Sequence, residues 1–220
     1  MKATLVGYTM PKIEGNDLET VEDLIAYCAR VSNPSNQLNK DTNKKLLQYL
    51  IKHKHWSPFE MANVVLEVET TRDIARQLLR HRSFTFQEFS QRYADPTKDF
   101  EFVYREARLQ DYKNRQNSIE VADPDLQKRW EEKQESILKL VQRSYEWAIA
   151  SGIAKEQARA ILPEGLTKSR LYVNGTIRSF IHYVELRTGP ETQKEHRELA
   201  LAMGNELAKV FADFKDIIPK

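Results

Sequence analysis

The sequence predicts an α+β fold: one domain with a small, mostly antiparallel sheet flanked by long helices. Three observations support this prediction. The 220 residues match the usual size of one domain, and no repeat or linker divides residues 1–220. Apolar residues recur at helical spacing over much of the chain. The few strand-like segments do not alternate regularly with helices, which argues against a doubly wound parallel sheet.

The first 81 residues are expected to form two strands and three helices. A short strand at residues 5–6 precedes helices over 18–31 and 41–54, where apolar side chains recur every three to four positions. Residues 63–69 alternate apolar and polar side chains, as in a strand with one face in water. A third helix then runs to about His81. The first helix is expected to bury Val21, Leu24, Ile25, Cys28 and Val31.

The second half of the chain contains two long helical patterns and several shorter ones. Residues 95–117 are polar and rich in tyrosine, which suggests a strand or two within irregular chain. A long helix follows from Asp123-Pro124 to about Ala150, and a short helix covers 154–162. Residues 171–173 predict a short strand that Asn174-Gly175-Thr176 break. The next helix is expected to bury Ile177, Phe180, Ile181 and Val184, and the last one Leu199, Met203, Leu207, Val210 and Phe214.

The composition excludes several classes of protein. The 34 Lys and Arg nearly balance the 32 Asp and Glu, so any attraction for anions must come from a local cluster. One cysteine can form neither an internal disulfide nor a Cys-rich zinc site. The N-terminus is too polar for a signal peptide, and no run approaches the roughly 20 apolar residues of a membrane helix. We therefore expect a cytoplasmic protein with no membrane segment.

The densest group of polar side chains lies between Gln77 and Tyr93, where a helix is expected to end. If that helix continued, Arg80, His81 and Arg82 would crowd three cationic groups into one turn. Cations gain only about 0.3 to 1 kcal/mol from a helix C-terminus. Guanidinium groups bind phosphate oxygens much more strongly, through paired charge-assisted hydrogen bonds. A phosphorylated ligand therefore explains this cluster best.

Two features around this cluster also have structural explanations. Arg72 and Arg76 share a helix face with Arg80, yet they could equally pair with acidic neighbours on a solvated surface, namely Glu67, Glu69 and Asp73. The phenylalanines that follow the cluster could offer flat faces to a nucleotide or a flavin, or they could belong to the core. These residues are Phe84, Phe86 and Phe89.

The same segment resembles the signature of the flavin-dependent thymidylate synthases, R-H-R-x-x-S-x-N-x-x-S-x-R. Arg80-His81-Arg82, Ser90 and Arg92 match five of its seven fixed positions, while Thr85 and Gln87 keep a hydroxyl and a carboxamide. Residues 55–60 resemble the family's H-x-[ST]-P-F-E loop, although Met61 stands where many members have histidine. Residues 158–163 and 174–187 resemble its nucleotide and catalytic segments, and the order agrees from about Ala26 to Arg197.

The resemblance implies a set of site residues. Those implied to contact the flavin FAD are Ser57, Arg80, His81, Arg82, Glu88, Arg178 and His182. Those implied to hold dUMP are Gln77, Arg80, Ser90, Gln91, Arg92, Arg159 and Arg187. Arg187 matches the arginine that faces the uracil ring, where a fixed positive charge favours the ionised pyrimidine and makes C5 a better nucleophile.

The resemblance also implies a reaction and an assembly. NADPH reduces FAD, methylenetetrahydrofolate donates a one-carbon unit to dUMP, the reduced flavin supplies a hydride, and tetrahydrofolate and dTMP leave. The family is homotetrameric, with active sites shared between subunits. The sequence contains neither a G-x-G-x-x-G motif after a strand nor a P-loop, so NADPH would bind loosely over an open flavin.

The remaining candidates for chemistry are expected to be structural. Cys28 lies on an apolar helical stripe, where a thiol usually packs as a small hydrophobe. His53 and His55 lack a third ligand, so no metal site is expected, and they are interpreted as loop residues near the flavin. His196 and Glu195 are expected on the surface or at a subunit interface.

One alternative from another class stays open, a nucleic-acid-binding module. In this interpretation the arginines form a basic stripe and the phenylalanines stack on bases. The stripe would consist of Arg72, Arg76, Arg80 and Arg82. A net charge of only +2 weighs against it, and no nucleic-acid partner is expected.

Overall fold

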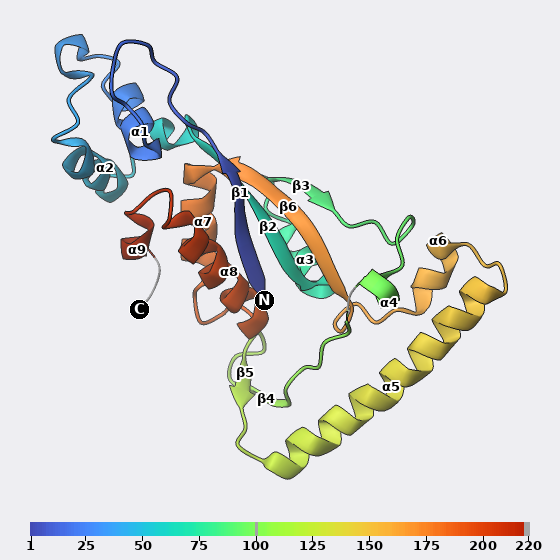
Figure 1. Cartoon of the computed structure of the whole chain (residues 1–220). Coiled ribbons are helices and arrows are strands. Elements are labelled where there is room, and N and C mark those ends of the chain that lie inside the picture. Colours follow the sequence, from blue (N-terminus) through green and yellow to red (C-terminus); the bar gives the residue numbers. More distant parts are fainter. Residues whose placement is uncertain (100, 218–220) are drawn as a thin grey trace.

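Four antiparallel strands form the central sheet, in the order β1–β2–β6–β3 (Figure 1). The computed structural model describes residues 1–99 and 101–217. The four strands are β1 (Lys2–Tyr8), β2 (Asn63–Thr71), β6 (Lys168–Thr176) and β3 (Thr85–Glu88). Buried and partly exposed residues alternate along β2, as its sequence pattern predicts. The α+β prediction with a small antiparallel sheet is therefore confirmed.

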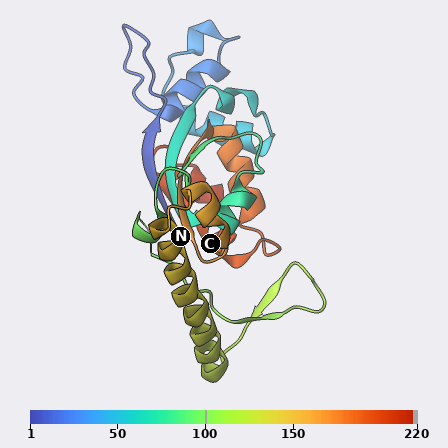
Figure 2. The same cartoon turned by 90° about the vertical axis from the view of Figure 1, so that its right-hand side faces the viewer.

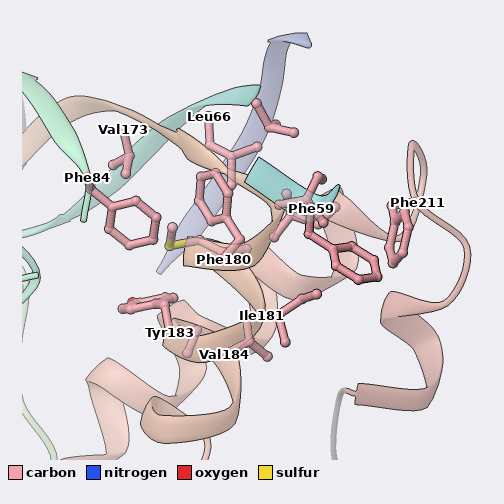
Figure 3. Packing of buried hydrophobic residues seen from close by; sticks show 14 of the residues in the cluster. Phe59, Leu66, Phe84, Val173, Phe180, Ile181, Tyr183, Val184 and Phe211 are labelled. Carbon is pink, nitrogen blue, oxygen red and sulfur yellow. The ribbon is translucent and has the colours of Figure 1, made fainter. Parts of the chain in front are cut away.

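Helices cover one face of this sheet, and the core lies between the two layers (Figure 2). They are α3 (Arg72–Leu78), α7 (Ile177–Arg187) and α8 (Lys194–Leu207). Aromatic rings fill the centre of the interface, where the ring centroids of Phe84 and Phe180 lie 4.7 Å apart (Figure 3). Tyr183 packs beside them and is 1% exposed. The other face of the sheet leaves Tyr172 exposed.

Two short helices extend the chain beyond one end of the sheet (Figure 1). They are α1 (Val21–Ala29), which starts with a capping box between Thr20 and Asp23, and α2 (Asn43–Lys52). After α2, the N–H of His55 donates to the carbonyl of Leu50 and that of Lys54 to Ile51, which is a Schellman motif. The left-handed position of this motif, where glycine is usual, holds Lys54 with a φ of 57°. The 3₁₀ turns η1 and η2 cover Pro34–Asn36 and Ser57–Glu60.

The long helix α5 (Pro124–Ala150) extends away from the sheet (Figures 1 and 2). Its prediction is confirmed in position, but several of its apolar side chains stay in contact with solvent. Tyr145 and Ala148 are buried, whereas several large apolar residues are exposed: Trp130, Ile137, Leu140 and Trp147. The remaining short elements are α4 (Pro96–Asp99), β4 (Arg108–Gln110), β5 (Ser118–Glu120), α6 (Lys155–Ala158), η3 (Arg159–Ile161) and α9 (Phe214–Ile217).

Several predicted boundaries are wrong. Strand β6 continues through residues 174–176, because these pair with β2 as far as Asn63, and Thr176 then caps α7 through its side chain. Helix α3 ends at Leu78, three residues before the expected end. The last helix ends at Leu207, and the side chain of Phe214 lies outside the described part of the chain. Val31, expected in the core, is 69% exposed. Within the described residues, no helix is long and apolar enough to cross a membrane.

Candidate active site

The segment after α3 is anchored by one aromatic side chain. The N–H of His81 donates to Leu78, and that of Phe84 donates to His81, so the chain turns sharply here. Phe84 then enters the core, 5% exposed, directly beneath Gly175 of β6. A Cβ atom on Gly175 would lie only 2.4 Å from Cδ1 of the Phe84 ring. Because Phe84 is a core residue, it is not free to stack on a ligand.

The structure brings His81 and Arg187 together although they are 106 residues apart. Nε of Arg187 donates a hydrogen bond to Nε2 of His81, at 2.9 Å. Burial, together with the positive charge of Arg187, lowers the pKa of His81 to about 4. His81 is therefore a neutral acceptor at pH 7, and the charge of Arg187 stays uncompensated by any carboxylate among the described residues. Two residues predicted for the flavin and substrate sites thus form one unit.

A buried polar cluster packs behind the His81–Arg187 pair. The sequence did not predict this cluster. His196, expected on the surface or at an interface, is 0% exposed, and Glu195 is 7% exposed. The imidazole of His196 lies between the hydroxyl of Tyr183 and the carboxamide of Gln77, 3.1 Å from each. The spacing of the last helix contained a signal, because His196 is three residues before Leu199 on the same apolar stripe.

Two neighbouring arginines of the cluster face solvent without acidic partners. Arg80 and Arg82 are exposed, and neither forms an ion pair with another described residue. Because α3 ends before them, they are not stacked in one helical turn. Their guanidinium groups are therefore free to bind an anion.

Arg72 and Arg76 behave differently from Arg80. Arg72 is buried and pairs with Glu88 at 3.3 Å and with Glu164 at 3.4 Å, and Arg76 reaches the same two carboxylates. The ion pairs expected for these arginines are therefore present, but not with Glu67, Glu69 or Asp73, because the carboxylates come from β3 and from the chain before β6. Glu88, predicted as a flavin contact, is held in this network and also accepts a hydrogen bond from Ser169.

The turn η2 packs against the outer side of α7. The rings of Trp56 and His182 meet edge to face, with centroids 4.7 Å apart. Arg178 pairs with Glu60, and Ser57 is exposed at the start of the turn. Three residues predicted for the flavin site, Ser57, Arg178 and His182, thus belong to one surface, although two of them lie about 120 positions further along the chain.

A second group of predicted residues lies near α6. Nε of Arg92 pairs with Glu156 at 3.5 Å, and Nε of Arg159 donates to the backbone carbonyl of the same glutamate. Gln91 is 4% exposed, and its Nε2 has no hydrogen-bond partner among the described residues. Ser90 accepts a hydrogen bond from the backbone of Arg92. In Figure 1, α3 and β3 lie between α6 and α7, so the two helices are apart within one chain.

One hollow of this chain lies away from the predicted site residues. A cavity of about 810 Å³ lies between the β4–β5 hairpin, the start of α5 and residues 190–197. None of the residues that the sequence predicts for the site lines it, although Gln193, a hydrogen-bond partner of Gln77, does.

Comparisons with known proteins agree on one family. The model of the family described as "Thymidylate synthase complementing protein" matches residues 16–212. A probable flavin-dependent thymidylate synthase of Paramecium bursaria Chlorella virus 1 is 50% identical over 211 residues, which cover 96% of this chain and 95% of the relative. The flavin-dependent thymidylate synthase of a Synechocystis species is 49% identical and covers 96% of both chains.

A solved structure shows the same fold. The UMP/dUMP methylase PolB of Streptomyces cacaoi, bound with 5-Br dUMP, superposes with a TM-score of 0.79. The match covers 98% of this chain and 93% of the other, at 24% sequence identity.

Proposed function

The chain belongs to the flavin-dependent thymidylate synthase family, and on that premise we propose that it methylates dUMP to dTMP. The carbon comes from methylenetetrahydrofolate, which leaves as tetrahydrofolate, and the hydride comes from FAD reduced by NADPH. The observation that supports this most directly is the contact between His81 and Arg187. This contact joins the two sequence segments that carry the family resemblance. It also leaves the positive charge of Arg187 without a carboxylate partner among the described residues.

The exposed arginines suit the flavin. FAD carries two phosphate groups, and Arg80 and Arg82 offer guanidinium groups that no described carboxylate neutralises. The surface formed by Ser57, Arg178 and His182 adds a hydroxyl and a ring at the outer side of α7. We assign these residues, with His81 and Glu88, to flavin binding, and Glu88 also holds β3 against α3. When bound, FAD supplies the hydride, and methylenetetrahydrofolate the one-carbon unit.

Arg187 is the proposed catalytic residue. Its Nε is bound to the neutral His81, which fixes the guanidinium without removing its charge. The two terminal nitrogens then remain available for the pyrimidine ring. A fixed positive charge near N3 of uracil favours the ionised ring and raises electron density at C5. The residue thus activates the substrate carbon, and no nucleophile from the protein is required.

Cys28 has the wrong environment for a thiolate mechanism. It is half-buried on α1, and burial raises the pKa of its thiol. A nucleophilic cysteine instead needs a lowered pKa among cationic groups. A single thiol that needs no disulfide partner also fits the cytoplasmic setting that we propose.

The dUMP site is proposed to be shared between copies of the chain. Ser90, Gln91, Arg92 and Arg159 form the group near α6, and Figure 1 shows α6 apart from α7, while the unpaired Nε2 of Gln91 leaves a donor for a ligand oxygen. A second copy could place its α6 group beside the Arg187 of the first. The exposed apolar residues of α5 provide a surface for such an assembly, and we propose a homotetramer.

The test is dTMP formation by the purified protein. Product is expected only when dUMP, methylenetetrahydrofolate, FAD and NADPH are all present, and the purified protein is expected to be yellow. Colourless protein that takes up no FAD but binds oligonucleotides with a steep salt dependence would support the nucleic-acid alternative. Two residues of that alternative are not accessible to a nucleic acid. Arg72 of the basic stripe and Phe84 of the stacking rings are both buried.

Arg187→Ala tests the assigned role. Turnover is expected to fall by about 100-fold or more, as for the loss of a group that stabilises developing charge, while the flavin stays bound. The matched control is Arg115→Ala, an exposed arginine between β4 and β5. Undiminished turnover in Arg187→Ala would exclude the role.

A further inference from the structure

We propose that His196 is a positioning residue: with Tyr183 it fixes the carboxamide of Gln77 so that Gln77 presents an N–H group to an oxygen atom of the substrate. The inference rests on the proposed function and on the family resemblance, which implies that Gln77 contacts dUMP. Neither His196 nor Tyr183 needs to touch the substrate. Both act through Gln77, which is partly exposed and contacts His196 at 3.1 Å.

Five polar side chains form a continuous chain of hydrogen bonds behind the His81–Arg187 pair. The hydroxyl of Tyr183 lies 3.1 Å from Nε2 of His196, and Nδ1 of His196 lies 3.1 Å from Oε1 of Gln77. Nε2 of Gln77 donates to Oε1 of Gln193 at 2.9 Å, and Nε2 of Gln193 donates to Glu195 at 2.9 Å. The chain therefore ends at a carboxylate.

The carboxylate end sets the direction of every bond. Burial by itself would raise the pKa of the Glu195 carboxyl. Hydrogen bonds from Arg108, Gln193 and the backbone, together with the charge of Arg105, outweigh burial and lower this pKa to about 2. An ionised carboxylate can only accept hydrogen bonds. Gln193 must therefore donate to Glu195 and accept from Gln77. Oε1 of Gln77 is then left to accept from Nδ1–H of His196.

The other end of the chain is consistent with this direction. A neutral imidazole has one donor and one acceptor nitrogen, so Nε2 of His196 must accept from Tyr183. Burial, together with the nearby Arg187 and His81, lowers the pKa of His196 to about 3 and keeps it neutral. Burial also raises the pKa of the Tyr183 hydroxyl, which therefore keeps its proton.

The consequence is a fixed orientation for Gln77. One N–H of its carboxamide is used by Gln193, and the second remains for a ligand. This N–H matches an acceptor oxygen, either a carbonyl of the pyrimidine ring or an oxygen of the phosphate. Without His196, Oε1 of Gln77 would lose its hydrogen-bond donor, and of these contacts only the one to Gln193 would hold the carboxamide, so the second N–H would no longer be fixed toward that acceptor.

The first test compares dUMP binding in three variants of the flavin-loaded protein. His196→Leu removes both hydrogen bonds of the imidazole and is expected to weaken dUMP binding about tenfold, as for one oriented hydrogen bond. It should raise KM by that factor and change kcat less. His196→Asn keeps a donor N–H near the position of Nδ1 and is expected to restore binding to within about threefold. Leu199→Val, a core change on the same helix, should leave dUMP binding unchanged.

The outcomes separate positioning from packing. Binding by His196→Leu within twofold of the wild type would overturn the proposal, and so would an equal loss in His196→Asn or in Leu199→Val. Competition by inorganic phosphate identifies the oxygen. If His196→Leu also weakens phosphate competition, the N–H faces the phosphate; if it weakens dUMP alone, the N–H faces the nucleoside. Each result supports the fixed orientation.

The second test does not depend on activity. In the protein labelled with ¹⁵N-histidine, long-range proton–nitrogen correlations report which ring nitrogen carries the proton. His196, identified by the signals lost in His196→Asn, is expected to be protonated at Nδ1, and protonation at Nε2 would overturn the proposal. A wild type that binds no dUMP would contradict the proposed function as well. A wild type that forms dTMP while His196→Leu binds dUMP normally would contradict this inference alone.

Discussion

Acidification from pH 7 to pH 5 is expected to destabilise the folded protein by about 2 kcal/mol through His196 alone. In the unfolded chain this histidine takes up a proton near its ordinary pKa of 6.5. In the folded protein, burial beside Arg187 and His81 lowers the pKa of His196 to about 3. The unfolded state therefore binds more protons between these two values. Stability is complete above pH 6.5 and falls as the pH decreases toward 3.

The magnitude follows from the difference between the two pKa values. Each pH unit below 6.5 favours the unfolded chain by about 1.4 kcal/mol per proton, so the interval from 6.5 to 5 corresponds to about 2 kcal/mol. His81, with its pKa lowered to about 4, is expected to add a similar loss. Glu195 contributes at lower pH, because its pKa is about 2 and its stabilisation is lost only below the ordinary value of 4.5.

Urea unfolding at pH 7, 6 and 5 measures the effect. The wild type is expected to lose about 2 kcal/mol more than His196→Asn over this interval, because the variant lacks the titrating group. Leu199→Val, which keeps both histidines, should lose as much as the wild type. Equal losses in the wild type and in His196→Asn would show that His196 is not held neutral, and the reasoning would be refuted.

Three further substitutions test the packing and the chemistry. Gly175→Ala should destabilise the protein by about 1 to 3 kcal/mol in urea unfolding, because its Cβ would meet the Phe84 ring at 2.4 Å. The control Gly7→Ala, whose Cβ would have no atom within 4 Å, should be close to neutral. Equal effects of the two substitutions would contradict the close approach. Lys54→Gly should raise the unfolding free energy by up to about 1 kcal/mol by relieving the left-handed φ of 57°, and a loss of stability would contradict that assignment. Cys28→Ala should keep dTMP formation and lose about 1 kcal/mol or less; a folded, flavin-loaded variant without activity would restore the thiolate mechanism.

The periodic parts of the fold could be predicted because local patterns specify them. The alternation along β2 and the Asp123-Pro124 start of α5 each identify an element without reference to the rest of the chain. The end of β6 could not be predicted in this way. Asn174-Gly175-Thr176 is a turn-forming sequence, yet pairing with β2 holds it extended, because the ladder gives partners to the backbone groups that face β2.

The candidate site shows the same division. The residue types around Arg80 indicate an anion-binding cluster from the sequence, since guanidinium groups next to each other repel unless an anion lies between them. The ion-pair partners of Arg72 and Arg76 could not be predicted from the sequence, because the sheet brings Glu88 and Glu164 to α3.

The sequence by itself determined the family, the order of the main elements and which residue types gather after α3. Only the tertiary structure decided that Arg187 meets His81, that His196 is buried against Gln77, and that α6 lies apart from α7 within one chain. The physical reason is that hydrogen bonds and ion pairs act over a few ångströms in space, whereas the residues that form them here are separated by about 100 positions or more along the chain.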